Sequence, residues 1–350
     1  MGINGTLLIV PFVIAFAFSF ASTPIVTQLA FKIGAVDIPK DNRRMHKKPI
    51  PRLGGLAIIF GFAVALLCVS HNLNRGIGAT MIGAAIIAVM GVIDDCKDLN
   101  AKLKFLIQII AALIVIYGGN VKITVFTNPN LLSDNPYLVF PEWLSVMLTV
   151  VWIVFITNAV NFIDGLDGLA AGVSAIMSVS LVFISVRTGE SAIAIIGMAL
   201  MGSCFGFLPY NFNPAKIFMG DTGSTFLGFM LATLSVQGVF KSYAVISFAV
   251  PLLILGLPLF DASFAMIRRI LTGKSPMTAD RGHLHHRLID MGFSQKQTVF
   301  ILYAISAVLG IAAVLLAESG AMRAILLIMC VLIFILIASL LGKAQADKKE

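Results

Sequence analysis

Residues 77–98 read I-G-A-T-M-I-G-A-A-I-I-A-V-M-G-V-I-D-D-C-K-D, in which a long uncharged run ends in two adjacent aspartates, Asp94 and Asp95. An α-helix needs roughly 20 predominantly apolar residues to cross the hydrocarbon core of a bilayer. Similar runs recur along the chain, because 59% of its 350 residues are hydrophobic and only 12% are charged. About 25% are charged in a typical soluble domain. This composition predicts a polytopic membrane protein and excludes a soluble enzyme, a secreted disulfide scaffold and a disordered chain.

Apolar runs predict an all-α architecture of eleven transmembrane helices in a single domain over residues 1–350. Three runs are short for a full crossing, so ten helices is the alternative. The runs lie near residues 5–31, 53–70, 77–93, 105–118, 143–163, 169–186, 192–210, 225–240, 243–267, 298–317 and 322–341. We also expect a turn-like outer loop at about 119–142, a cytoplasmic His/Arg loop at 268–297 and a cytoplasmic tail at 342–350.

The distribution of basic residues predicts the orientation of these helices. If the helices alternate, one set of loops holds twenty of the 25 Lys and Arg residues and the other set holds five. Loops rich in Lys and Arg stay in the cytoplasm, which places the N-terminus outside the cell and the C-terminus inside. The net charge of +8 is then explained by basic loops beside anionic lipid, and no nucleic acid is expected as a partner.

Five aspartates lie where predicted spans meet the cytoplasmic surface, and they are Asp94, Asp95, Asp164, Asp167 and Asp221. Two like charges about 4 Å apart repel by about 4 kcal/mol at an effective dielectric of about 20, so carboxylates that converge need a cation. Oxygen ligands without cysteine favour a hard cation such as Mg²⁺, with Mn²⁺ as the alternative. A solvated helix end is the competing interpretation for a single acid, but it is weak for three such sites on one face.

Asn158, Asn161, Asp164 and Asp167 recur every three residues, which predicts that they lie along one side of a helix end. Glycines interleave with these aspartates and also flank Asp221, and glycine allows the backbone to approach an anion closely. Such a stripe of donors and acceptors suits a nucleotide or a sugar. Contacts between helices in the membrane are the alternative role of the same pattern.

Basic and histidine side chains supply the opposite charge. Lys48 and Lys104 are candidate phosphate contacts, and the segment 280–288 reads D-R-G-H-L-H-H-R-L. Its candidate functional side chains are those of Arg281, His283, His285, His286 and Arg287. Arg binds phosphate oxygens in bidentate fashion, so the segment favours a diphosphate. A structural role and a zinc site are the alternatives, although the arginines would repel a metal cation.

Four segments together resemble the motifs of the polyprenyl-phosphate N-acetylhexosamine-1-phosphate transferases, glycosyltransferase family 4. They read D-D-C-K-D-L-N-A-K-L-K, N-A-V-N-F-I-D-G-L-D-G-L, N-P-A-K-I-F-M-G-D-T-G-S and D-R-G-H-L-H-H-R-L. The resemblance covers nearly the whole chain, including the number and orientation of the spans. It implies an Mg²⁺-dependent transfer from a UDP-N-acetylhexosamine to undecaprenyl or another polyprenyl phosphate on the inner leaflet of the cell membrane, releasing UMP, in cell-wall, teichoic-acid or surface-polysaccharide synthesis.

The resemblance also implies roles for individual residues. Asp221 resembles a direct Mg²⁺ ligand, and Asp94 and Asp95 resemble the acids that position the metal and the lipid phosphate. The remaining catalytic side chains would be those of Asp164, Asp167 and Lys104. The substrate-binding side chains would be those of Lys48, Asn158, Asn161, Asn213, Phe218, Arg281, His283, His285, His286 and Arg287, with Phe218 stacking on uracil.

The loop sequence G-H-L-H-H-R resembles the branch of the family that transfers GlcNAc-1-phosphate. The branch that makes the MurNAc-pentapeptide lipid typically has a P-x-H-H-H loop, so a phospho-MurNAc-pentapeptide transferase is the alternative. An ion-coupled transporter, from a different class, is expected to have acids near the bilayer midplane, whereas here they lie at one surface. The expected partners are the UDP-sugar, undecaprenyl phosphate and the lipid bilayer, with a homodimer as the oligomer considered.

Overall fold

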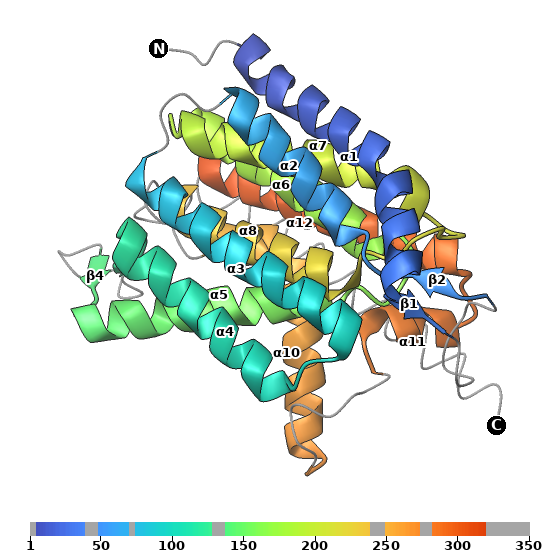
Figure 1. Ribbon diagram of the computed structural model, residues 1–350. Helices are drawn as coiled ribbons and strands as arrows, with labels where there is room; N and C mark the ends of the chain where they lie inside the picture. The colour runs from blue at the N-terminus through green and yellow to red at the C-terminus, as the bar shows by residue number, and fades with distance from the viewer. Residues whose placement is uncertain are drawn as a thin grey trace.

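The computed structural model of the chain describes residues 5–38, 48–69, 74–127, 137–238, 249–273 and 282–319, and it consists almost entirely of α-helices (Figure 1). The helices are α1 (Gly5–Ile33), α2 (Gly55–Val69), α3 (Arg75–Lys97), α4 (Ala101–Leu113), α5 (Glu142–Phe162), α6 (Leu169–Arg187), α7 (Ser191–Asn211), α8 (Gly220–Gly238), α9 (Ala249–Ile254), α10 (Gly256–Leu271), α11 (Leu284–Asp290) and α12 (Gln295–Ser319). A π-helical turn, Ile114–Gly118, continues α4. The predicted all-α class is confirmed.

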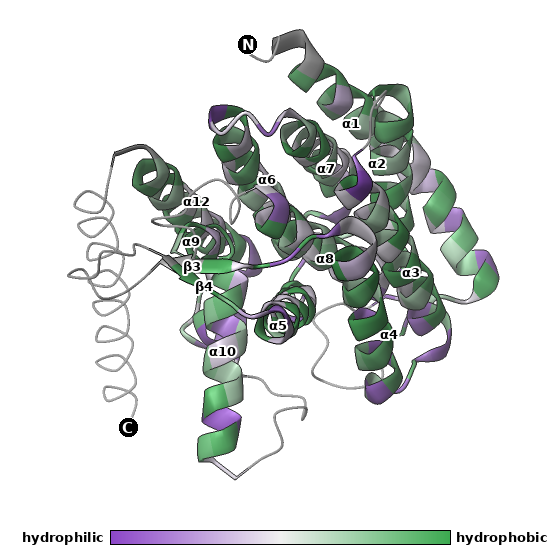
Figure 2. Cartoon of the chain, turned by 90° about the vertical axis from the view of Figure 1, so that its left-hand side faces the viewer, coloured by the Kyte–Doolittle hydropathy of each residue, from purple (hydrophilic) through white to green (hydrophobic). Residues whose placement is uncertain are grey.

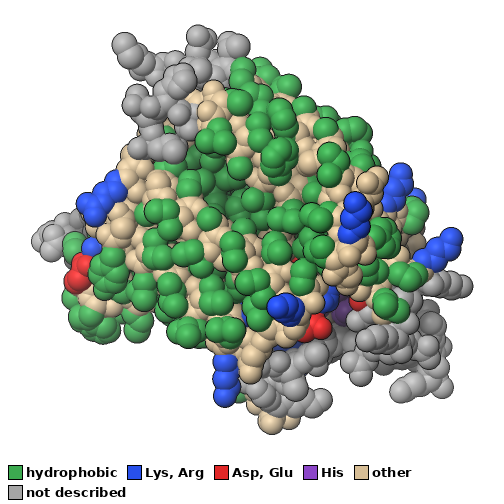
Figure 3. Space-filling model, viewed as in Figure 1, with side chains coloured by type: hydrophobic (Ala, Val, Ile, Leu, Met, Phe, Trp, Pro, Cys, Tyr) green, Lys and Arg blue, Asp and Glu red, His purple; other side chains and the backbone are tan. Residues whose placement is uncertain are grey.

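Seven of these helices are long and apolar enough to cross a membrane, namely α1, α3, α4 with its π turn, α5, α6, α7 and α12, and α2 is a shorter apolar helix. Hydrophobic side chains cover much of the face of the bundle seen in Figure 3, while the charged side chains on it gather toward its edges. The chain is therefore a multi-pass membrane protein. The predicted span 322–341 and the tail 342–350 lie outside the described residues, so the count of eleven spans stays a prediction.

Helix α8 lies in the middle of the bundle (Figure 2). All of its residues from Thr222 to Gly238 are buried, and it packs against α2, α3, α5 and α6. Because lipid does not contact it, α8 can carry polar side chains that bond inside the protein. Ser235 accepts a hydrogen bond from the Trp152 indole at 3.0 Å, for example. This interior position explains why the predicted span at 225–240 is short and only weakly apolar.

The prediction of one continuous span at 243–267 is wrong for its described part. Helix α9 ends at Ile254, and α10 begins at Gly256. Pro258 has no N–H to donate to the carbonyl of Ile254, so the helical ladder is interrupted there. Helix α10 then extends away from the other helices (Figure 1).

The structure also contains two short antiparallel strand pairs, which the sequence analysis did not predict. Strand β1 (Val36–Asp37) pairs with β2 (Ile50–Pro51). Strand β3 (Val125–Thr127) pairs with β4 (Tyr137–Val139), within the loop predicted to be turn-like. The β1–β2 pair connects α1 to α2 next to the beginning of α8, so it helps to build the end of the bundle described below.

Backbone contacts join the beginnings of α2 and α8. The N–H of Phe218 donates to the carbonyl of Pro51 at 2.8 Å, and the N–H of Gly54 donates back to the carbonyl of Phe218 at 2.9 Å. A Cβ atom at Gly55 would overlap the backbone of Gly223, so this approach requires glycine. The chain on either side of Phe218 is thereby held in place.

Candidate active site

A cavity of about 520 Å³ opens at the end of the bundle where α3 and α5 end and α8 begins. Its volume lies in the range of small-molecule sites, roughly 300–1,000 Å³. The predicted site residues that line it are Asp95, Asn161, Asp164, Asp167, Asn213, Phe218, Asp221 and His286. Segments far apart in the sequence therefore contribute to one site, as the motif positions predict.

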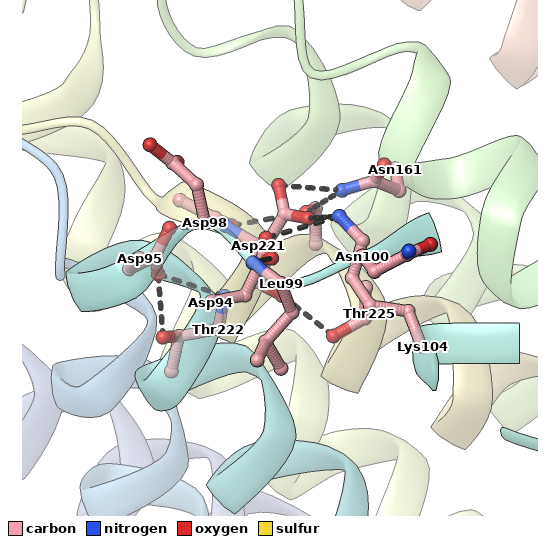
Figure 4. A network of polar contacts seen from close by, with 12 residues as sticks. Asp94, Asp95, Asp98, Leu99, Asn100, Lys104, Asn161, Asp221, Thr222 and Thr225 are labelled. Carbon is pink, nitrogen blue, oxygen red and sulfur yellow. Dashed lines mark hydrogen bonds and ion pairs between the residues drawn. The ribbon is translucent and has the colours of Figure 1, made fainter. Parts of the chain in front are cut away.

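Lys104 lies between two aspartates from different helices (Figure 4). Its Nζ is 3.0 Å from Oδ2 of Asp94, at the end of α3, and 2.9 Å from Oδ2 of Asp221, in the first turn of α8. The other oxygen of Asp94 accepts a hydrogen bond from the N–H of Leu99 at 2.7 Å. The ammonium group of Lys104 thus neutralises two carboxylates that would otherwise repel each other.

Asp95 fixes the beginning of α8. Its Oδ1 accepts a hydrogen bond from the N–H of Asp221 at 2.9 Å, and its Oδ2 accepts bonds from the N–H and the hydroxyl of Thr222 at 3.0 and 2.6 Å. These N–H groups have no partner inside their own helix, so a carboxylate from α3 caps α8. Gly220, at a φ of 71°, has no Cβ that would overlap the Asp95 carboxylate. Asp95 therefore positions Asp221, while its direct ligation of a metal stays a prediction.

Asp164 and Asp167 lie in the turn between α5 and α6. Oδ2 of Asp167 accepts hydrogen bonds from the Asn213 amide at 2.9 Å and from the N–H of Ala215 at 3.0 Å. Burial, followed by repulsion from three neighbouring carboxylates, raises the pKa of Asp164 to about 8; those carboxylates belong to Asp221, Asp95 and Asp167. A bound cation would reverse this effect, because it favours the ionised carboxyl.

The predicted polar stripe divides between two roles. The Asn161 amide donates to Oδ1 of Asp221 at 3.1 Å and to the hydroxyl of Ser224 at 2.8 Å. Asn158, one turn earlier, instead donates to Gln108 of α4 at 2.6 Å and does not line the cavity. Its position matches the alternative of a contact between membrane helices, because each amide satisfies the other away from water.

The His/Arg loop contributes less to the cavity than its sequence suggests. His283 and His285 are 7% and 3% exposed, and of the predicted His and Arg contacts that are described in the loop, only His286 lines the cavity. Arg287 lies over the Phe264 ring, with Cζ 4.9 Å from the ring centroid. Burial, followed by the charge of the neighbouring His286, lowers the pKa of His285 to about 4.

Of two further predicted contacts, one does not line this cavity and the other is not described by the structure. Lys48 is exposed just before β2 and is not among the residues that line the cavity, and Arg281 lies outside the described residues. No group of three or more His, Cys, Asp or Glu side chains is arranged to hold a metal ion within the described ranges. Between Asp94 and Asp221 the cation is Lys104, and zinc binding by the loop stays an untested alternative.

Several polar residues at this end were missed in the sequence. Arg52 donates to the Asp95 carbonyl at 3.1 Å, Gln295 accepts from the Asn213 amide at 2.7 Å, and Asp261 bonds to His283 at 2.9 Å. Asp261 was detectable, because a carboxylate inside an apolar run marks a functional or paired position. Arg52 and Gln295 carry no such signal in the sequence.

Comparison with known proteins assigns the family. The model of glycosyl transferase family 4 matches residues 77–239. The probable undecaprenyl-phosphate N-acetylglucosaminyl 1-phosphate transferase of Bacillus subtilis (strain 168) is 42% identical over 337 residues, which cover 96% of this chain and 92% of the relative. The decaprenyl-phosphate N-acetylglucosaminephosphotransferase of Mycobacterium leprae (strain TN) is 36% identical over 312 residues, which cover 81% of this chain and 77% of the relative.

A more distant relative, the undecaprenyl-phosphate alpha-N-acetylglucosaminyl 1-phosphate transferase of Escherichia coli (strain K12), is 27% identical over 303 residues, covering 83% of this chain and 78% of the relative. The residues matched by the family model include the end of α3, the turn after α5 and the whole of α8, which build the acidic part of the cavity. The resemblance of the four sequence motifs is confirmed, and the chain belongs to glycosyl transferase family 4.

Proposed function

We propose that this protein transfers GlcNAc-1-phosphate from UDP-GlcNAc to undecaprenyl phosphate, forming the lipid diphosphate-linked sugar and releasing UMP. The observation that carries the proposal is the meeting of four carboxylates, Asp95, Asp164, Asp167 and Asp221, in one cavity at the end of a membrane-spanning bundle. A lipid phosphate and a water-soluble nucleotide can both reach such a position. The names of the relatives support the acceptor and the sugar.

The cavity suits the nucleotide half of the donor. Phe218 lines it, and hydrogen bonds from its own N–H and to its own carbonyl fix its backbone at the edge of the cavity. Asn213 and Asp167 line the same cavity and share a hydrogen bond of 2.9 Å. In the proposal, Phe218 stacks on uracil, and the carboxylate and amide groups contact the nucleoside.

The acidic part of the cavity has the oxygen donors that Mg²⁺ prefers. Asp221 would hold the ion, with Asp94, Asp95 or Asp164 completing the set, and Mn²⁺ could take its place. When bound, the ion would neutralise charge on the sugar diphosphate. Burial, and after it the repulsion from Asp221, Asp95 and Asp167, raises the pKa of Asp164 to about 8, and a bound cation would offset that repulsion.

Lys104 and His286 supply the polar groups that the chain itself brings to the phosphates. Lys104 is 26% exposed in its side chain and already bridges Asp94 and Asp221. Phosphoryl transfer depends mainly on positioning and on neutralisation of charge. In the proposal, Lys104 offsets the repulsion between Asp94 and Asp221 and contacts a phosphate oxygen, while His286 contacts the sugar diphosphate.

We place this cavity on the cytoplasmic face of the cell membrane. Supporting this, the predicted topology puts loops with twenty of the 25 Lys and Arg residues at this end of the bundle, whereas Lys122 and Glu142, paired at 2.7 Å, lie at the opposite end. In a variant without native cysteines, Lys296→Cys should react with an impermeant reagent only after the membrane is opened. Glu190→Cys, between α6 and α7, should react in intact cells, and the reverse pattern would refute the orientation.

Release of UMP tests the reaction. Purified protein supplied with Mg²⁺, undecaprenyl phosphate and UDP-GlcNAc should release UMP and form a lipid-linked sugar diphosphate. UDP-MurNAc-pentapeptide should not replace UDP-GlcNAc. Turnover with the pentapeptide donor alone would favour the other branch of the family, and solute flux in proteoliposomes without UMP release would favour a transporter. Light scattering of the same preparation would show whether the protein is a homodimer.

A further inference from the structure

Asp261 is a buried carboxylate that the proposed reaction does not use directly. It lies in the second turn of α10 and is 7% exposed. Its carboxyl group borders a small apolar cavity that is lined by residues such as Leu257, Leu284 and Leu302. A carboxylate in such surroundings is unfavourable unless its oxygens are paired, so its contacts indicate why it is there.

Both oxygens of Asp261 bind the beginning of α11. Oδ2 lies 2.9 Å from Nδ1 of His283, and Oδ1 accepts a hydrogen bond from the N–H of Leu284 at 2.7 Å. Leu284 is the first residue of α11, and His283 directly precedes it. One side chain of α10 therefore fixes both the imidazole ring and the backbone at the point where α11 begins.

A second contact holds α11 on the same helix. Arg287 lies over the ring of Phe264, which is three residues after Asp261 and hence on the same side of α10. Two of the predicted phosphate ligands, His283 and Arg287, thus bind α10 and leave the cavity to another residue of the loop.

That residue is His286. It lines the cavity together with Asp164, and its ring centroid is 4.3 Å from that of His285. His285 in turn is 3% exposed and packs over Gly165, where a Cβ atom would overlap its ring. Helix α11 is therefore fixed between α10 on one side and the acidic turn on the other, and this placement determines where His286 lies.

We propose that Asp261 is a positioning residue which, through His283 and the beginning of α11, holds His286 at the cavity. This inference rests on the proposed transferase function. In this arrangement His283 and His285 hold the loop in place, and His286 is the histidine of the described loop that lines the cavity.

A double-mutant cycle tests the proposal. Asp261→Asn keeps the shape of the side chain but can accept only one of the two hydrogen bonds from the beginning of α11, because its amide nitrogen donates where a carboxylate oxygen accepted. Partners that orient a functional histidine typically change activity by about 10- to 100-fold when removed. We expect Asp261→Asn to lower kcat/KM for UDP-GlcNAc by about that factor and to shift kcat and KM in the same ratio as His286→Ala does.

In the His286→Ala background, Asp261→Asn should have no further effect on kcat/KM. Independent losses that multiply would overturn the proposal, as would wild-type kinetics for Asp261→Asn alone. Asp261→Glu, which keeps the charge, should recover part of the activity. If Asp261→Asn does not accumulate in the membrane, His283→Asn breaks the same contact from the other side and replaces it in the cycle.

A matched control separates positioning from general loss of stability. Gln237 is 4% exposed and donates to Thr80 at 2.9 Å at the opposite end of α8. Gln237→Met should lower the thermal midpoint and leave kcat and KM of the folded enzyme unchanged, both alone and with His286→Ala. If the wild-type protein releases no UMP, the proposed function is refuted. If the wild-type protein is active but the losses caused by Asp261→Asn and His286→Ala multiply, only the role of Asp261 is refuted.

Discussion

Replacing Lys104 with Met should expose the repulsion that its ammonium group now suppresses. The Nζ atom lies 3.0 Å from Oδ2 of Asp94 and 2.9 Å from Oδ2 of Asp221, so the two carboxylates are at most about 6 Å apart. Two like charges at about 6 Å repel by about 3 kcal/mol at an effective dielectric of about 20. Removing one partner of a buried ion pair destabilises proteins by about 3–5 kcal/mol, and the lower end of that range applies here because Lys104 and Asp221 are partly exposed.

We therefore expect Lys104→Met to lower the free energy of unfolding by about 3 kcal/mol and to abolish most UMP release. Mg²⁺ should raise the thermal midpoint of the variant more than that of the wild type, because a divalent cation can bind between the two carboxylates. The assay is thermal unfolding in detergent over an Mg²⁺ titration, together with UMP release.

Lys102→Met is the matched control. Lys102 is an exposed lysine of the same helix, two residues away, so its replacement should change neither the thermal midpoint nor the turnover. If Lys104→Met also keeps the wild-type midpoint and turnover, the reasoning from repulsion between the two aspartates is refuted.

Three further predictions follow from the same end of the bundle. Asp221→Asn keeps the volume of the side chain but removes a charge, so UMP release should fall by orders of magnitude at an unchanged fold, while Glu142→Gln at the opposite end should have little effect; normal turnover of Asp221→Asn at every Mg²⁺ concentration would exclude the assigned role. Arg287 contacts Phe264 rather than the cavity, so Arg287→Lys should leave the KM for UDP-GlcNAc nearly unchanged, and a large rise would show that this arginine reaches the donor. The pKa of Asp164 is raised to about 8, so below pH 8 its carboxyl is mostly protonated and must lose the proton to bind a cation; Mg²⁺ binding at pH 7 should release a proton, and its affinity should increase up to about pH 8. Calorimetry in two buffers of different ionisation enthalpy measures that proton, and a release that persists in Asp164→Asn would contradict the assignment.

The apolar runs predicted most of the helices because lipid imposes a simple condition on a sequence. A segment that crosses hydrocarbon must be apolar over its whole length, and the described helices α1, α3, α5, α6 and α7 follow the predicted runs closely. Helix α8 deviates because protein, and not lipid, surrounds it, so burial inside the bundle permits serine, threonine and glutamine. The interruption near Pro258 was also readable in principle, since proline cannot continue the helical ladder.

For the polar residues of the site, the sequence pattern predicted which aspartates meet but not which asparagine faces the cavity. Asp164, Asp167 and Asp221 line one cavity as predicted, because each follows or begins a helix at the same end of the bundle. The three-residue spacing of Asn158 and Asn161 did not reveal that a neighbouring helix, through Gln108, binds the first of them. Which of two equivalent amides faces a cavity depends on the partner helix, and a spacing along one helix contains no information on that partner.

By itself, the sequence determined the membrane class, the family and the set of acids, since these depend on composition and on local motifs. Only the tertiary structure decided how the charges are shared. Lys104 bridges Asp94 and Asp221, Asp95 caps α8, and Asp261 holds His283 away from the cavity. These contacts join residues from 10 to 126 positions apart in the chain. Hydrogen bonds act over about 3 Å, so which pairs form depends on the packing of whole helices.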